Sequence, residues 1–298
     1  MKPSDWEYLP FFLAVARAGN LRAGAALLNA NYGTVNRNIQ ALEASYGVGL
    51  FNRSRKGFEL TDAGESLVPI AEELERTVIS ARRQIEGRDK TETGTIRFSV
   101  TPTLAYDIVA PIIGSFHAKY PDIQVEMRIT SEIESINRAE TDISLRAAMD
   151  VTDDVVARKL YAIANGIFAS KRYVTDVFPQ AGPLGDGLDW IGFPGTADLA
   201  AWLAKTQFPH ASIRHSVGDG PMRIAMLRQH CGMSELPVIF GKIHPDLVQV
   251  PGTEIKLGPS LWILLHTDLR RTVRVRRFVD HLSEGLLALK SNFQVGEI

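Results

Sequence analysis

The pattern of apolar and polar positions at the start of the chain predicts three short helices. An apolar stripe at helical spacing runs through residues 11–16, and the Gly-Asn pair after it interrupts the pattern. A second helix is expected over residues 21–28, where small side chains let a neighbouring helix approach closely. Asn31 suits the N-cap of a third helix, whose apolar positions in residues 35–42 are spaced four and three apart.

The second and third helices, with the turn between them, have the outline of a helix-turn-helix. The third helix carries polar side chains away from its apolar face, and such side chains suit base edges and phosphates. Taken alone, the same pattern also fits an ordinary solvated helix. The candidate DNA contacts here are Asn31, Tyr32, Thr34, Asn36 and Arg37.

A basic hairpin is predicted directly after the third helix. Residues 50–54 and 58–60 read as two short strands, joined by a tip that ends in Gly57. Cations at a hairpin tip can simply improve solubility. Beside a helix-turn-helix, however, they form a wing suited to DNA phosphates. The candidate wing contacts are Arg53, Arg55 and Lys56.

Residues 63–90 are expected to form one long helix. Its apolar positions are spaced 3, 4, 4, 3 and 4 residues apart, which approximates a coiled-coil seam and favours dimerisation. Packing of this helix on its own domain is the alternative. The candidate dimerisation residues are Leu67, Ile70, Leu74, Val78, Ala81 and Ile85.

From residue 91 onward, predicted strands and helices alternate. This order indicates a twisted α/β sheet that binds its ligand at the carboxyl ends of the strands. Strands are expected at 95–101, 123–129, 142–146, 166–169, 190–193, 213–217 and 261–266, and helices at 108–116, 196–205, 222–230 and 273–289.

The composition of the chain limits which classes of protein it can belong to. The chain has 298 residues, 45% apolar and 22% charged, which fits a soluble globular protein of two or three domains. No apolar run is long enough to span a bilayer, no secretory signal is visible, and the lone Cys231 excludes an intramolecular disulfide. A cytoplasmic location is therefore expected.

The charge is unevenly distributed. The chain carries a net charge of −1, but residues 1–58 hold seven basic side chains against three acidic ones. A basic head on a mildly acidic body indicates an anionic partner for the head alone.

The stretch from Phe11 to Gly64 resembles the DNA-binding domain of LysR-type transcriptional regulators, without gaps. The residues that carry this resemblance include Phe12-Leu13-Ala14-Val15-Ala16, Ala23 to Leu28, Gly47-Val48-x-Leu50-Phe51-x-Arg53 and Leu60-Thr61-x-Ala63-Gly64. Asn31-Tyr32-Gly33 and Asn36 depart from the family's usual residues, so its base preference does not transfer. The body is similar to the family more weakly, and His230 replaces a family Gly.

The resemblance implies an α+β multidomain protein. It would comprise a winged helix-turn-helix (1–62), a linker helix (63–90) and a two-lobed α/β effector-binding domain (91–298), which is like a periplasmic binding protein. Lobe I would span about 91–162 plus 268–298, and lobe II about 163–267. The implied function is a transcriptional regulator that binds double-stranded DNA as a homodimer or homotetramer, without cofactor or metal.

Candidate effector contacts lie on turns that follow strands. Hydroxyls and free backbone N–H groups on such turns suit a carboxylate or phosphate, although the threonines can equally cap the next helix. A buried arginine suits an anion or a structural partner, and the histidine can be purely structural. The candidates are Thr101, Thr103, Arg146, Ser216, Asp219 and His266. They favour an acidic metabolite or an amino acid.

Two other classes of function fit the sequence less well. An enzyme would need a nucleotide-binding loop, a zinc motif or a nucleophile motif, and none occurs in the sequence. The neighbours His230 and Cys231 are poorly placed in sequence to act as a base and a nucleophile. A two-lobed solute-binding protein is the other alternative, but the basic winged head is against it.

Overall fold

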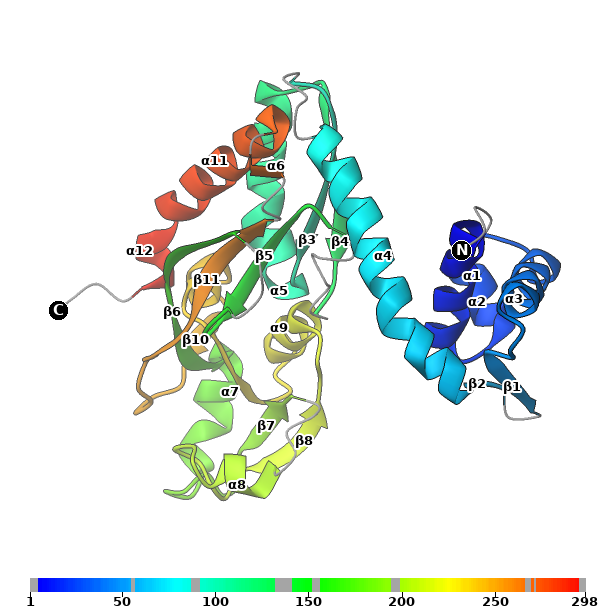
Figure 1. The fold of residues 1–298 in the computed structure, drawn as a ribbon. Helices are drawn as coiled ribbons and strands as arrows, with labels where there is room; N and C mark the ends of the chain where they lie inside the picture. Colours follow the sequence, from blue (N-terminus) through cyan, green and yellow to red (C-terminus); the bar gives the residue numbers. More distant parts are fainter. Residues whose placement is uncertain are drawn as a thin grey trace. The chain divides into compact units, whose positions relative to one another are not determined.

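The computed structural model describes residues 5–54, 57–86, 92–131, 141–151, 156–193, 199–265, 269–270 and 272–294. The chain divides into two compact units, residues 1–85 and 86–298 (Figure 1).

Unit 1 begins with three helices, and local caps set the bounds of the second and third. They are α1 (Asp5–Ala18), α2 (Leu21–Leu27) and α3 (Tyr32–Tyr46). Asn20 and Asn31 each accept a backbone N–H at 2.8 Å and so cap α2 and α3. Gly47 ends α3 in the left-handed conformation, with φ of +72°.

A hairpin and a long helix complete unit 1. The strands β1 (Phe51–Ser54) and β2 (Gly57–Leu60) pair antiparallel, and α4 (Asp62–Glu86) follows. Figure 1 shows the hairpin at one side of the three helices. Arg17 on α1 ties this bundle to α4, because its Nη2 lies 2.7 Å from Glu75 Oε2 and 3.2 Å from Glu72 Oε1.

The core of unit 1 depends on a close approach between α1 and α2. Phe12, Val15 and Ile39 are fully buried at its centre. A Cβ added at Gly24 would lie 2.7 Å from Val15 Cγ2 and 3.1 Å from its backbone nitrogen. Only glycine therefore fits this position without a shift of one helix.

Unit 2 is built on one mixed sheet, and its described strands lie in the order β4-β3-β5-β11-β6-β9-β7-β8, with β10 paired to β6. The strands are β3 (Gly94–Val100), β4 (Ile123–Ile129), β5 (Ile143–Ala148), β6 (Val156–Ser170), β7 (Asp189–Gly192), β8 (Ser212–Ser216), β9 (Met233–Pro237), β10 (Leu247–Gln249) and β11 (Lys256–Leu265).

Two long strands join the two lobes of unit 2. The strand β6 pairs with β11 through its first part and with β9 and β10 through its last part. Lobe I contains β3 to β5, and lobe II contains β7 to β10. The prediction of a strand at 166–169 was therefore too short, because β6 spans 15 residues and crosses between lobes.

Helices cover both lobes (Figure 1). Phe116 and Phe278 meet edge to face at 5.0 Å where α6 and α11 cover the sheet of lobe I. The helices are α5 (Pro102–Leu104), the π-helical turn η1 (Ala105–Val109), α6 (Ala110–Lys119), α7 (Lys171–Asp176), the 3-10 turn η3 (Phe178–Gln180), α8 (Leu199–Leu203), α9 (Gly220–Arg228), α10 (Ile239–Ile243), α11 (Val273–Ala288) and α12 (Lys290–Phe293).

The close approach at Gly24 gives a test of the head's packing. Gly24→Ala should destabilise unit 1 by roughly 1–3 kcal/mol through overpacking against Val15. Gly33→Ala, on exposed α3, should stabilise it by up to about 1 kcal/mol because alanine favours helix. Native-state hydrogen exchange of the α1–α3 amides measures both effects. Equal effects of the two substitutions would contradict the packing described.

Candidate DNA-binding head and effector site

The helix α3 presents a polar face to solvent. Tyr32 is 52% exposed, and Arg37 is also exposed. Thr34 is half-buried, and its backbone N–H is held by the Asn31 side chain. These residues lie within the first two turns of one helix, so their side chains can reach a common surface.

Asn36 differs from its neighbours on α3. Its side chain is half-buried, and its Oδ1 is buried without a hydrogen-bond partner. An unpaired buried acceptor is costly, so this oxygen lacks the hydrogen bond that a buried polar atom ordinarily makes.

The hairpin is fixed to α3 by one carboxylate. Glu43 Oε1 accepts the backbone N–H of Leu50 at 2.8 Å and that of Phe51 at 3.2 Å. This links the last part of α3 directly to the start of β1. Of the predicted wing contacts, Arg55, Lys56 and the side chain of Arg53 lie outside the described residues.

The seam predicted along α4 is divided between two environments. Leu67 and Leu74 pack partly against the core of the three-helix head, as the alternative interpretation of this helix expected. Ile70 and Val78 are 55% and 64% exposed, and Ala81 is exposed as well. The side chain of Ile85 lies outside the described residues.

An apolar groove of about 240 Å³ runs between α1 and α4. Both the partly buried and the exposed positions of α4 contribute to it. Its lining includes Trp6, Pro10, Leu13, Leu74, Val78 and Ile79. Trp6 is 45% exposed, so unit 1 alone leaves this apolar surface open to solvent.

In unit 2, the first turn of α9 meets the turn that carries the predicted threonines. Thr101 stands at the N-cap position of α5, but its hydroxyl makes no capping hydrogen bond. Thr103 packs so tightly on Gly220 that a Cβ there would lie 2.9 Å from the Thr103 Cβ. The two lobes therefore touch at Thr103 and Gly220.

The other predicted effector contacts have mixed environments. Arg146 is buried, and it donates hydrogen bonds to Ser99 Oγ at 2.6 Å and to the Leu145 carbonyl at 3.0 Å. Ser216 is exposed at the end of β8. Asp219 is exposed and caps α9 by accepting the Met222 N–H at 2.8 Å. His266 lies outside the described residues.

Sequence reasoning missed Arg223, one turn into α9. This side chain is only 5% exposed, and its guanidinium stacks on the Phe193 ring at 3.6 Å from the ring centre. Burial lowers the pKa of Arg223 to about 10, against opposing effects of Asp219 and Glu235. No sequence pattern signals this burial, since an arginine in a helix ordinarily faces solvent.

A further contact joins the lobes beside a small cavity. His244 Nε2, after α10 of lobe II, lies 3.4 Å from Asp107 Oδ2 on η1 of lobe I. The adjoining cavity has a volume of about 150 Å³ and is lined in part by Thr103, Tyr106, Asp107, Pro221, Arg228 and His244.

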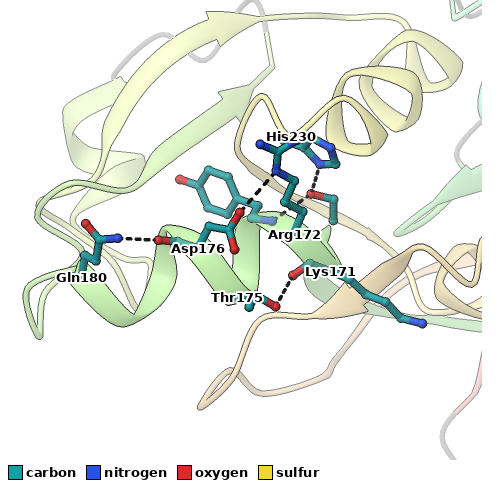
Figure 2. A network of polar contacts seen from close by, with 8 residues as sticks. Lys171, Arg172, Thr175, Asp176, Gln180 and His230 are labelled. Atoms are coloured by element: carbon teal, nitrogen blue, oxygen red, sulfur yellow. Dashed lines mark hydrogen bonds and ion pairs between the residues drawn. The ribbon is translucent and has the colours of Figure 1, made fainter.

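His230 and Cys231 do not form a catalytic pair. Figure 2 shows the His230 ring turned toward the start of α7, where its Nδ1 lies 2.7 Å from Ser170 Oγ. The Cys231 thiol instead lies 3.7 Å from the Gln229 carbonyl. His230 has a φ of +65°, so it adopts the left-handed conformation that glycine takes most readily.

Two family models match the chain. Residues 89–287 match the LysR substrate binding domain, and residues 6–65 match the bacterial regulatory helix-turn-helix protein of the lysR family. The chain belongs to the LysR family. It is a LysR-type transcriptional regulator with a helix-turn-helix domain and a two-lobed effector-binding domain, which confirms the predicted fold class and function.

Curated relatives of the LysR-type chain are transcriptional regulators. An HTH-type transcriptional regulator of Xanthomonas campestris pv. campestris (strain 8004) is 35% identical over 167 residues, which are 55% of this chain and 47% of that protein. The match thus spans about half of that relative. The probable HTH-type transcriptional regulator LtrA of Klebsiella pneumoniae is 24% identical over 297 residues, 95% of each chain.

Solved structures of LysR-type regulators share this fold. CrgA of Neisseria meningitidis aligns with a TM-score of 0.58 and 21% identity, over 94% of this chain and 98% of that one. The full-length virulence activator AphB of Vibrio cholerae aligns with a TM-score of 0.58 and 22% identity, over 95% and 98%.

Two kinds of feature are absent from the described part of this LysR-type chain. None of the helices in that part is long and apolar enough to cross a membrane. Nor do the described residues include a cluster of three or more His, Cys, Asp or Glu side chains that could hold a metal ion.

The carboxylate that fixes the hairpin can be tested. Glu43→Ala should remove the shared acceptor of the Leu50 and Phe51 amides, at a cost of about 1–3 kcal/mol locally. Hydrogen exchange of these two amides should then accelerate roughly tenfold or more. Glu59→Ala, which removes an exposed carboxylate from β2, is the control and should leave both amides unchanged. Unaltered exchange in Glu43→Ala would show that other contacts hold the hairpin.

Proposed function

We propose that this LysR-type regulator binds double-stranded DNA with α3 in the major groove and the hairpin against the backbone. The observation that carries this proposal is the exposed polar face of α3, joined through Glu43 to a hairpin in the basic part of the chain. The base contacts would come from Asn31, Tyr32, Thr34, Asn36 and Arg37. The phosphate contacts would come from Arg53, Arg55 and Lys56.

The functional parts are assigned as residues 1–62 for DNA binding, 63–90 for dimerisation and 91–298 for effector binding. Lobe I takes about 91–162 and 268–298, and lobe II about 163–267. The protein would act in the cytoplasm without catalysing a reaction.

The helix and the hairpin should contribute to DNA binding in different ways. Arg55→Ala should weaken binding to every sequence alike and reduce the slope of log affinity against log salt by about 0.9, one phosphate contact. Arg37→Ala should cost about 1–3 kcal/mol on the preferred site and relax the sequence preference. Fluorescence anisotropy on DNA found by protection mapping upstream of the protein's own gene measures both.

Lys290→Ala, an exposed cation of α12 in unit 2, is the matched control and should change neither quantity. If Arg37→Ala and Arg55→Ala both leave affinity, preference and salt slope as in the wild type, another surface binds DNA.

A second copy of the chain is proposed to cover the groove between α1 and α4. Ile70, Val78 and Trp6 together leave an apolar surface along these helices that water would otherwise contact. Leu67, Leu74, Ala81 and Ile85 would complete the interface, with Leu67 and Leu74 also supporting the head. A homodimer, or a homotetramer made of two such dimers, would place two heads on an interrupted palindrome.

A single charge on α4 should test this interface. Val78→Asp places a carboxylate in the groove and should give monomers in analytical ultracentrifugation, with loss of binding to paired half-sites. Thr77→Asp adds the same charge one residue earlier, on a different side of α4, and should remain dimeric. Monomeric wild-type protein, or a Val78→Asp protein that stays dimeric, would overturn the interface.

The effector is proposed to be a small acidic metabolite or an amino acid held where the lobes meet. Thr101 and Thr103 would contact it from lobe I, and Ser216 and Asp219 from lobe II, with Arg146 and His266 nearby. A ligand that contacts both lobes favours one lobe arrangement over another, and that difference is what allows it to change DNA binding.

A further inference from the structure

Arg223 is a buried cation with two donor nitrogens that no described residue satisfies. It lies on α9 of lobe II and is 5% exposed. No described residue accepts a hydrogen bond from its Nε or Nη1. Asp219 and Glu235 act on it electrostatically, but no described carboxylate forms an ion pair with it. Buried charges in proteins are ordinarily paired and hydrogen-bonded, so this arginine lacks a directly bonded anionic partner among the residues that the structure describes.

Two other arginines that could bind an anion already have partners. Arg228, one turn further along α9, donates to Asp246 Oδ2 at 2.7 Å. Arg146, the cation that sequence reasoning favoured for an anionic effector, donates to Ser99 and Leu145 within lobe I. Of these three cations, Arg223 alone has buried donors without a described acceptor.

Arg223 also lies beside the junction of the lobes. Gly220, at the start of its helix, packs on Thr103 of lobe I. Phe193, which stacks on the guanidinium, directly follows β7, and the last residue of β7 pairs with Ser216. The guanidinium is thus at the carboxyl edge of lobe II's parallel strands, where α/β sheets bind ligands.

The surroundings of Arg223 favour an anion in two further ways. The ring of Phe193 covers one face of the guanidinium at 3.6 Å, which fixes its plane and leaves the N–H edges as donors. The positive end of α9 lies within a turn of the same place, and it adds to the attraction for negative charge.

We propose that Arg223 binds the negatively charged group of the effector, a carboxylate or a phosphate, at the junction of the lobes. This inference rests on the effector site proposed above and deepens it, since it names the charge of the ligand and the residue that recognises it. Arg223 takes the role that the sequence suggested for Arg146.

The test uses the full-length protein, thermal unfolding and simple anions. Sodium succinate and sodium phosphate are compared with sodium chloride at equal ionic strength, so that general salt effects cancel. One of the two anions should raise the wild-type midpoint by roughly 2–5 °C over chloride, because a ligand that binds the folded state stabilises it. The anion with the larger shift identifies the group as carboxylate or phosphate.

Arg223→Met should abolish this shift, and Arg228→Met, which removes the paired arginine of the same helix, should retain it. In chloride alone, Arg223→Met should melt at or above the wild-type temperature, since it removes a buried charge that Asp219 and Glu235 compensate only in part. An arginine with a purely structural role would instead lower the midpoint when replaced.

Three results would overturn the role of Arg223. They are a wild-type midpoint that neither anion shifts, an anion shift that survives in Arg223→Met, and an Arg223→Met protein that melts well below the wild type in chloride. Thr103→Val separates this inference from the wider site. If Thr103→Val keeps the anion shift that Arg223→Met loses, Arg223 binds anions but the effector site at the lobe junction is wrong.

Discussion

A single apolar core that runs through both lobes is the constraint on which unit 2 depends. Ile108 and Val109 of lobe I belong to the same buried cluster as Ile224 and Leu227 of lobe II. Protein interiors are packed as densely as organic crystals, so such a core does not deform smoothly. Relative motion of the lobes therefore needs discrete rearrangements of side chains around α5, η1 and α9. Thr103 and Arg223, two of the proposed effector residues, lie on α5 and α9 themselves.

Much of the fold follows from local patterns in the sequence. Residues 123–129 alternate strictly in polarity, and β4 has those bounds. Asn31 follows a turn and precedes apolar residues at helical spacing, and it caps α3 as expected. These elements were predictable because the signal lies within a few neighbouring residues, and tertiary packing reinforces it.

The sequence-based predictions fail where contacts between residues far apart in the chain determine the structure. The first part of β6 was missed because Arg158 and Lys159 are exposed and hide the strand pattern, although β11 pairs with them. The strand β9 was missed because the buried Ser234 is polar. Its hydroxyl is satisfied by a hydrogen bond to the Ile191 carbonyl, which the sequence pattern does not reveal. The importance of Arg223 depends on Phe193 and on the absence of a described acceptor, which no sequence pattern encodes.

The length of β6 has a consequence for how such a chain can evolve. Tyr161 and Ile163 of this strand belong to the core shared by both lobes, whereas Ile167 and Ala169, further along it, contribute to a separate cluster within lobe II. Side chains alternate along a strand, so deleting one residue between these pairs would reverse the faces of one lobe relative to the other. The strand register thus couples the side-chain orientation of one lobe to that of the other. Insertions or deletions that the fold tolerates here should therefore involve an even number of residues.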